Sequence, residues 1–229
     1  MELIIVEKLV KFEGQNDSWG NAETIGHGLS SAPTCMVLKN IDKSDEWQVF
    51  YSDYGSFSIG GSTPAHNSLV WSNSSALYTN QSYKGWGGVM PTSTVFTVDG
   101  NNANGAGETI LCYCFANCSN YIKSGFYKGN ANATNSPVIY TGFRPEWLVI
   151  RYLGSGESWI VIENASMPYN KDRRNYRFGT NSESSGSTYE IDLLSNGFKP
   201  RTTWEGLNGN GYIITYLAIG QPFKYGTAV

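Results

Sequence analysis

The residues that could carry chemistry in this chain do not form the sets that catalysis or metal binding requires. The sequence of 229 residues has only two histidines, His27 and His66, and neither has the spaced cysteine or carboxylate partners of a metal site or a catalytic triad. It has four cysteines, at Cys35, Cys112, Cys114 and Cys118. Their spacing fits no standard zinc site, and the alternation of Cys112 and Cys114 with larger side chains is typical of a strand with both thiols in a core. We therefore expect no catalytic residue, no metal and no cofactor.

Paired carboxylates are a further set with catalytic meaning, because two of them can hydrolyse a glycosidic bond. Asp42, Asp45 and Glu46 lie together before Trp47, and the matching stretch of the second half keeps only Glu157. An ordinary solvated loop explains such residues equally well. Glycan hydrolysis is therefore the third function that we consider, behind two non-enzymatic roles.

Aromatic side chains in a loop-rich segment are the strongest candidates for ligand binding. The stretch from residue 54 to 86 is rich in glycine, serine and asparagine, and four rings lie in its second half: Trp71, Tyr78, Tyr83 and Trp86. Such rings stack on sugars or anchor protein interfaces. The alternative is that they pack inside and that the segment caps a sheet. We predict that residues 54–86 form the working face and that the second half of the chain serves mainly as a docking or spacing element.

The elements that must position these residues repeat along the chain. Pro33 and Trp47 recur as Pro145 and Trp159, both with a shift of 112 residues. The motif Asn-Gly-x-Gly at 104–107 recurs at 208–211. A repeat of this length is one whole small domain. We therefore predict two similar domains, residues 1–120 and 121–229, with Trp47 and Trp159 buried in equivalent places.

Short apolar and aromatic stretches bounded by Gly, Asn, Ser and Pro predict strands throughout, and helical periodicity is nearly absent. The strands predicted in the first copy are 8–12, 34–39, 46–51, 69–71, 95–98 and 109–116. Those in the second copy are 125–128, 147–152, 159–163, 176–178, 191–194, 197–202 and 211–219. We predict an all-β fold of two tandem β-sandwich or jelly-roll-like domains. Each Asn-Gly pair is expected to close a β-hairpin between a strand led by phenylalanine and the strand that follows.

Composition and charge argue against several classes of partner. Charged residues make up 15% of the chain, against roughly 25% in an average soluble protein. A net charge of −3 without a long basic run predicts no binding of nucleic acid. The apolar stretch from Leu3 to Val6 is too short for a signal peptide or for membrane insertion. We expect a protein made in a cytoplasm, with the composition of an extracellular or virion β module.

Seven stretches carry a resemblance that covers essentially the whole chain. They are Ile25–Leu29, Pro91–Val98, Ile110–Ala116, Gly125–Asn130, Val138–Pro145, Asp192–Lys199 and Gln221–Tyr225. Together they resemble a tandem-repeat β domain family of unknown function that recurs in virion proteins of marine tailed bacteriophages, many of which look like tail fibres or adhesins. No catalytic residues are established for that family, so the resemblance assigns none here.

The resemblance implies a non-enzymatic structural protein of the virion, exposed on the particle and of the tail-fibre or host-adhesion type. A capsid decoration or head-fibre protein is the alternative, because the chain is short and shows no anchoring region before the repeat. The expected partners are other virion proteins and a host-surface glycan or protein. We also expect a homo-oligomer, with a trimer favoured, because sheet edges associate readily and particles are symmetric.

Overall fold

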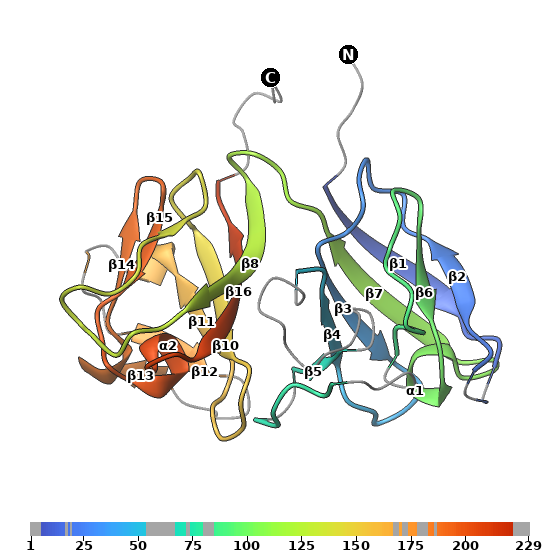
Figure 1. Ribbon diagram of the computed structural model, residues 1–229. Coiled ribbons are helices and arrows are strands. Elements are labelled where there is room, and N and C mark those ends of the chain that lie inside the picture. Colours follow the sequence, from blue (N-terminus) through green and yellow to red (C-terminus); the bar gives the residue numbers. More distant parts are fainter. Residues whose placement is uncertain are drawn as a thin grey trace, which may run out of the picture. The chain divides into compact units, whose positions relative to one another are not determined.

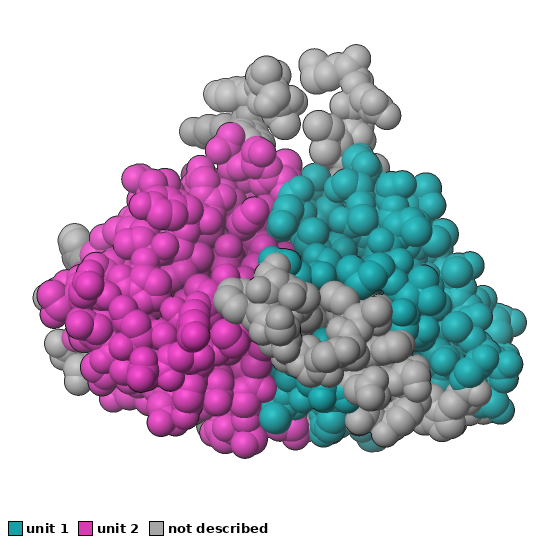
Figure 2. All heavy atoms as spheres, in the orientation of Figure 1, with its two compact units in different colours: residues 1–72, 76–117 teal, residues 73–75, 118–229 magenta. Residues whose placement is uncertain are grey.

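The computed structural model shows a chain that is nearly all β. The described residues are 6–16, 18, 20–53, 67–71, 74–79, 85–166, 170, 174–177, 183–185 and 187–221. The chain divides into two compact units (Figures 1 and 2). The first unit takes in Met1–Ser72 and Ala76–Asn117, and the second Asn73–Ser75 and Cys118–Val229. The main division after Asn117 lies three residues before the boundary expected from the sequence.

Two antiparallel sheets enclose the core of the first unit. Among its described residues, one sheet has five strands in the order β1 (Glu7–Glu13), β7 (Thr109–Phe115), β3 (Cys35–Asn40), β4 (Gln48–Tyr51) and β5 (Leu69–Val70). The other pairs β2 (Glu23–Gly26) with β6 (Val95–Val98). Apolar side chains alternate along β7, where Ile110, Cys112 and Cys114 are fully buried. They pack in one cluster with Phe96 of β6, which confirms Cys112 and Cys114 as core residues.

The second unit has the same layered plan. Among its described residues, one sheet has six strands in the order β13 (Glu183–Ser185), β12 (Arg174–Arg177), β11 (Ile160–Glu163), β10 (Trp147–Tyr152), β16 (Ile213–Ile219) and β8 (Ile122–Lys128). The other has the order β14 (Ile191–Leu194), β15 (Gly197–Pro200) and β9 (Ile139–Tyr140). Leu148 and Ile150 of β10 pack with Ile191 and Phe198 from the smaller sheet in one buried cluster.

Short helices complete both units. Those in the described part of the chain are α1 (Asn101–Asn104), α2 (Glu205–Asn208), and the 3-10 helices η3 (Asn164–Ser166) and η4 (Ser187–Tyr189). The described part of the chain contains no helix that is long and apolar enough to cross a membrane.

The sheet order repeats from one unit to the other. In the first unit the neighbouring strands are, in order, β1, β7, β3 and β4. Their counterparts in the second unit, β8, β16, β10 and β11, are neighbours in the same order. The register repeats as well, because Cys35 lies opposite Phe115 and its counterpart Trp147 lies opposite Ile219. The sequence repeat is therefore matched by strand order and by pairing, residue for residue, in the central strands.

The two conserved positions of tryptophan in the repeat are equivalent in place but not in burial. Trp47 directly precedes β4 and Trp159 directly precedes β11, and β4 and β11 are counterparts. Trp159 is 0% exposed, as expected from the sequence. Trp47 is only half-buried, so the expectation of equal burial is wrong for the first copy.

The Asn-Gly pairs do not close hairpins, which corrects the sequence prediction. β6 pairs with β2 whereas β7 pairs with β1 and β3, so the chain crosses between sheets at this point. Helix α1 ends at Asn104 and α2 at Asn208, and the glycines that follow have negative φ values. The positive φ falls instead on the second glycine of each motif, Gly107 at 72° and Gly211 at 76°.

A buried asparagine explains why the motif recurs without a hairpin. Asn104 and Asn208 are 1% and 0% exposed, so their amides need partners inside the protein. The side-chain oxygen of Asn104 accepts a hydrogen bond from the backbone N–H of Gln15 at 3.0 Å. The oxygen of Asn208 accepts the equivalent bond from Asn130 at 2.9 Å. The motif therefore ties each short helix to the chain that leaves the first strand of its unit.

Candidate ligand-binding site

Of the four rings predicted to bind a ligand, one lies in the core of the first unit. Trp86 is 2% exposed and its ring centroid lies 5.5 Å from that of Phe50, so it is a core residue. Its proposed role in ligand stacking is wrong, because a buried ring cannot meet a ligand. Trp71 and Tyr78 are half-buried, while Tyr83 and residues 54–66 lie outside the described residues.

A different set of aromatic rings gathers in the second unit. Tyr152 at the end of β10 stacks on Tyr212, with ring centroids 4.4 Å apart and planes at 10°. Tyr189 at the end of η4 meets Trp204 edge to face, with centroids 4.8 Å apart and planes at 80°. All four rings are partly exposed. Because they come from separate segments, only the fold places them in one region.

Two charged side chains, Arg177 and Glu157, contact the pair of rings formed by Tyr189 and Trp204. The guanidinium carbon of Arg177 lies 4.9 Å from the ring centroid of Tyr189 and 5.2 Å from that of Trp204, within the range of cation–π attraction. An Nη2 atom of Arg177 lies 3.5 Å from Oε2 of Glu157. The side chain of Trp204 also forms a hydrogen bond with Glu157. Trp204 is thus fixed by contacts with three neighbouring side chains.

Burial raises the pKa of the Glu157 carboxyl above its ordinary value, because the charged form loses solvation. The positive charge of Arg177 opposes this change, whereas the negative charge of Glu205 adds to it. The net direction is upward. Glu157 therefore holds its proton more tightly in the folded protein than in the unfolded chain.

Glycines let these rings lie directly on the backbone. A Cβ atom added at Gly206 would lie 2.3 Å from the indole of Trp204, and one at Gly154 would lie 2.3 Å from the ring of Tyr152. At Gly209 it would lie 2.5 Å from Tyr212. Real Cβ atoms do not approach other atoms so closely. Only glycine at these positions leaves room for the rings to pack against the backbone.

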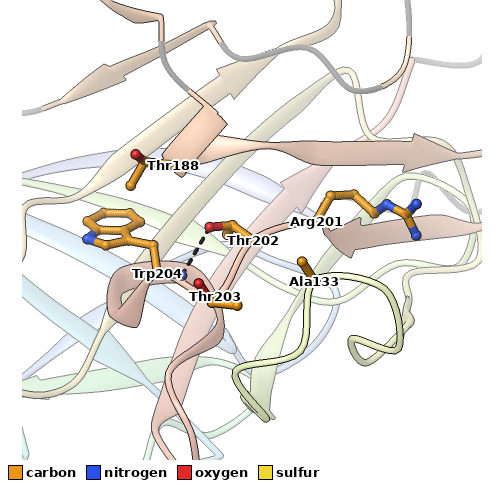
Figure 3. A pocket seen from close by; sticks show the side chains of 6 residues that line it. All are labelled: Ala133, Thr188, Arg201, Thr202, Thr203 and Trp204. Carbon is orange, nitrogen blue, oxygen red and sulfur yellow. Dashed lines mark hydrogen bonds between the residues drawn. The ribbon is translucent and has the colours of Figure 1, made fainter.

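A hollow of about 410 Å³ lies beside Trp204, and its lining mixes polar and apolar groups (Figure 3). It is lined by Ala133, Thr188, Arg201, Thr202, Thr203 and Trp204. In Figure 3 Thr188 lies beside the indole and the guanidinium of Arg201 extends at the opposite end. The hydroxyl of Thr202 accepts a hydrogen bond from the backbone N–H of Trp204 at 3.0 Å, which fixes the turn that carries the indole.

The hollow is large enough to hold a small ligand. Its volume falls within the roughly 300–1,000 Å³ that ligand pockets occupy. Arg201 is held by Asp192, with Nε and Oδ2 at 3.4 Å. Among the residues that the structure describes, no group of three or more His, Cys, Asp or Glu side chains is placed to hold a metal ion. Burial also raises the pKa of the Cys35 and Cys112 thiols, so neither is an activated nucleophile.

Comparing equivalent positions of the two copies in the sequence could have indicated part of this site. Tyr152 takes the place that Asn40 has in the first unit, and Tyr212 takes the place of Glu108. There the polar pair is hydrogen-bonded, with Nδ2 of Asn40 donating to Oε2 of Glu108 at 2.5 Å. Sequence reasoning sought aromatic residues in the longer copy. It missed the positions at which the second copy replaces polar residues by rings.

Comparisons with known proteins give a family but no function. A family model described as a domain of unknown function, DUF7483, matches residues 8–222 and thus nearly the whole chain. No curated protein and no solved structure matches the chain.

Proposed function

Because this chain belongs to the DUF7483 family, whose function is unknown, we propose a role from its own residues. The protein is a non-enzymatic structural protein of a bacteriophage particle, exposed on the virion and of the tail-fibre or host-attachment type. Its task is to bind a ligand on the host surface. The sequence resemblance to virion proteins supports the location, and the second unit supports the binding.

The observation that carries the binding role is the fixed, partly exposed indole of Trp204 beside the hollow (Figure 3). Aromatic side chains that are rigid before binding lose little conformational entropy when a ligand arrives. Affinity per copy from a shallow hollow is modest, and many copies on one particle raise it by avidity. We therefore propose that the working face lies on the second unit and not on residues 54–86 of the first.

The proposal includes self-association and attachment to other virion proteins. Strand β1 forms one edge of the five-stranded sheet among the described residues, and β8 forms the corresponding edge in the second unit. Edge strands can pair with strands of other chains. We propose a trimer, and the mass of the purified chain measured by light scattering tests it. A monomer at all concentrations, on and off the particle, contradicts this part of the proposal.

Labelling of particles with a gold-tagged antibody against the chain tests the location. Gold at the tail supports the attachment role, and gold over the capsid supports the alternative of a decoration or head-fibre protein. Both roles are contradicted if intact particles carry no gold and mass spectrometry finds no copy of the chain in them.

Glycan hydrolysis is the third candidate, favoured by one observation. Glu157 has a raised pKa and is influenced by a second carboxylate, Glu205, as in pairs that supply a general acid and a base. Release of reducing sugar from host envelope by the wild-type protein, lost in Glu157→Gln, would support this activity. We propose binding instead, because Arg177 and Trp204 engage the Glu157 carboxyl.

A further inference from the structure

We propose that strand β1 pairs with β1 of a second copy of the chain, antiparallel and about a two-fold axis at Leu9. The sheets that contain β1 in the two copies then form one continuous sheet. This contact goes beyond the proposed attachment role, and it gives self-association a specific strand and register. It is supported by the backbone groups of β1, by the apolar side chains on one of its faces and by the order of its charges.

The backbone groups of every second residue in β1 point away from β7. At one end of the ladder the N–H of Gly14 donates to the carbonyl oxygen of Glu108 at 2.9 Å. At the other end the carbonyl oxygen of Val6 accepts from the N–H of Ala116 at 2.8 Å. Because an antiparallel ladder alternates, the even-numbered residues of β1 bond to β7, and the odd-numbered ones direct their N–H and C=O groups to the other side. Among the described residues no strand lies on that side, so the odd-numbered residues can bond to a strand of another copy.

Two exposed apolar side chains lie on the face of β1 and β7 that turns away from the core. Val10 and Phe12 pack against the buried cluster of the first unit, so the odd-numbered residues of β1 lie on the opposite face. Leu9 is 48% exposed there, and Tyr113, directly opposite it on β7, is 38% exposed. Both line a hollow of about 260 Å³, which leaves room for a side chain of a partner. A two-fold axis at Leu9 places the two leucines side by side between the two tyrosines, and this removes exposed apolar surface from water.

The order of the exposed charges along β1 favours this register over its neighbours. With the axis at Leu9, Glu7 of each copy lies opposite Lys11 of the other, and opposite charges across a ladder stabilise pairing. An axis at Val10 would instead place Glu7 opposite Glu13. An axis at Lys11 would place two lysines opposite each other. Like charges in such places destabilise pairing, so the charges select the register that also joins the two leucines.

The number of copies in the assembly of the purified full chain tests the contact, measured by sedimentation over a wide range of concentrations. Two copies support the contact and contradict the proposed trimer. Six copies support both, because the contact then joins two trimers. Three copies overturn the contact and leave the trimer standing, and a single copy at every concentration overturns both.

Charge reversal tests the register. We expect Glu7→Lys alone and Lys11→Glu alone each to weaken the association by roughly tenfold or more, because each change places two pairs of like charges across the ladder. A mixture of the two variants should associate to within about threefold of the wild type, because every such pair then again joins a lysine to a glutamate. Lys8→Glu is the matched control, since it makes the same change of charge in β1 at an exposed residue whose backbone bonds to β7. It should associate as the wild type does.

The mixture and the control decide the result. A mixture that stays dissociated under conditions in which the wild type associates overturns the pairing of β1 in this register. A loss of association in Lys8→Glu as large as in Lys11→Glu overturns it as well, because net charge then explains the effect. Association restored in the mixture, with Lys8→Glu close to wild type, supports the contact and also shows that both single variants are folded.

Discussion

At the scale of single residues, the contact between Trp204 and Gly206 is the most specific feature of the site. Replacement of a helical glycine by alanine ordinarily stabilises a protein by roughly 0.5–1 kcal/mol. Here the added Cβ would lie 2.3 Å from the indole, so we expect Gly206→Ala to destabilise the protein. In a Trp204→Ala background the same change should be neutral or stabilising. Urea unfolding of the wild type, the two single variants and the double variant measures this coupling. An equal effect of Gly206→Ala in both backgrounds would contradict the contact between Gly206 and the indole.

The buried amides of Asn104 and Asn208 should each stabilise one unit. Alanine at either position leaves the backbone N–H of Gln15 or of Asn130 without its acceptor. We expect a loss of about 1–3 kcal/mol for each. Asn210→Ala is the control, because Asn210 is exposed next to the same motif. If urea unfolding shows the same loss of stability for Asn210→Ala as for the other two variants, the hydrogen bonds of Asn104 and Asn208 do not explain the motif.

Glu157 should make stability depend on pH in a predictable direction. Its pKa is raised in the folded protein, so the folded state binds the proton more tightly than the unfolded chain does. The stabilisation from this group is complete below its ordinary pKa of 4.5 and is lost as the pH rises through the raised value. We therefore expect wild type to gain stability relative to Glu157→Gln on acidification. Unfolding of both proteins across this range checks it, and a difference that stays constant would contradict the raised pKa.

At the scale of elements, the chain that leaves the first strand of each unit passes very close to a helix end. A Cβ atom at Gly14 would lie 2.3 Å from the carbonyl oxygen of Gly105, and one at Gly129 would lie 2.4 Å from that of Gly209. Alanine at Gly14 or Gly129 should cost about 2 kcal/mol or more, since backbone atoms cannot move aside cheaply. Gly26→Ala is the control, because its nearest neighbour would be 4.0 Å away. Thermal unfolding should separate the first two variants from the third.

The strands themselves could be predicted well where side-chain alternation is strong. The predicted ranges 95–98, 147–152 and 191–194 coincide with β6, β10 and β14. The pairing of strands could not be predicted around the Asn-Gly motif. A turn signal is local, whereas Asn104 is committed to a hydrogen bond with Gln15, 89 residues away. Long-range bonds of this kind leave no local pattern in the sequence.

The candidate site was less predictable than the fold, for a physical reason. Tyr152, Tyr189, Trp204 and Tyr212 lie on four segments, and their ring contacts exist only once the sheets have formed. The clustering of aromatic residues along the sequence instead predicted a binding site in the segment around Trp71 and Trp86. Trp86 was needed for the core, where it packs on Phe50.

At the scale of the whole molecule, two units of one strand order carry different side chains at equivalent positions. In the first unit the pair Asn40 and Glu108 is joined by a hydrogen bond, and Lys43 forms an ion pair with Glu108. In the second unit stacked tyrosines occupy the equivalent places of Asn40 and Glu108. After a duplication, one copy is free to change its surface while the other keeps its own. We interpret the second unit as the copy specialised for binding.

Adsorption of phage particles that carry a single substitution tests the central claim most directly. The account predicts that Trp204→Ala particles incorporate the chain at the wild-type copy number but adsorb to host cells roughly tenfold more slowly or worse, whereas particles with Tyr140→Ala, a change at an exposed ring outside the lining of the hollow, adsorb as the wild type does. Wild-type adsorption by Trp204→Ala particles with full incorporation would contradict the claim that the hollow beside Trp204 is the attachment site.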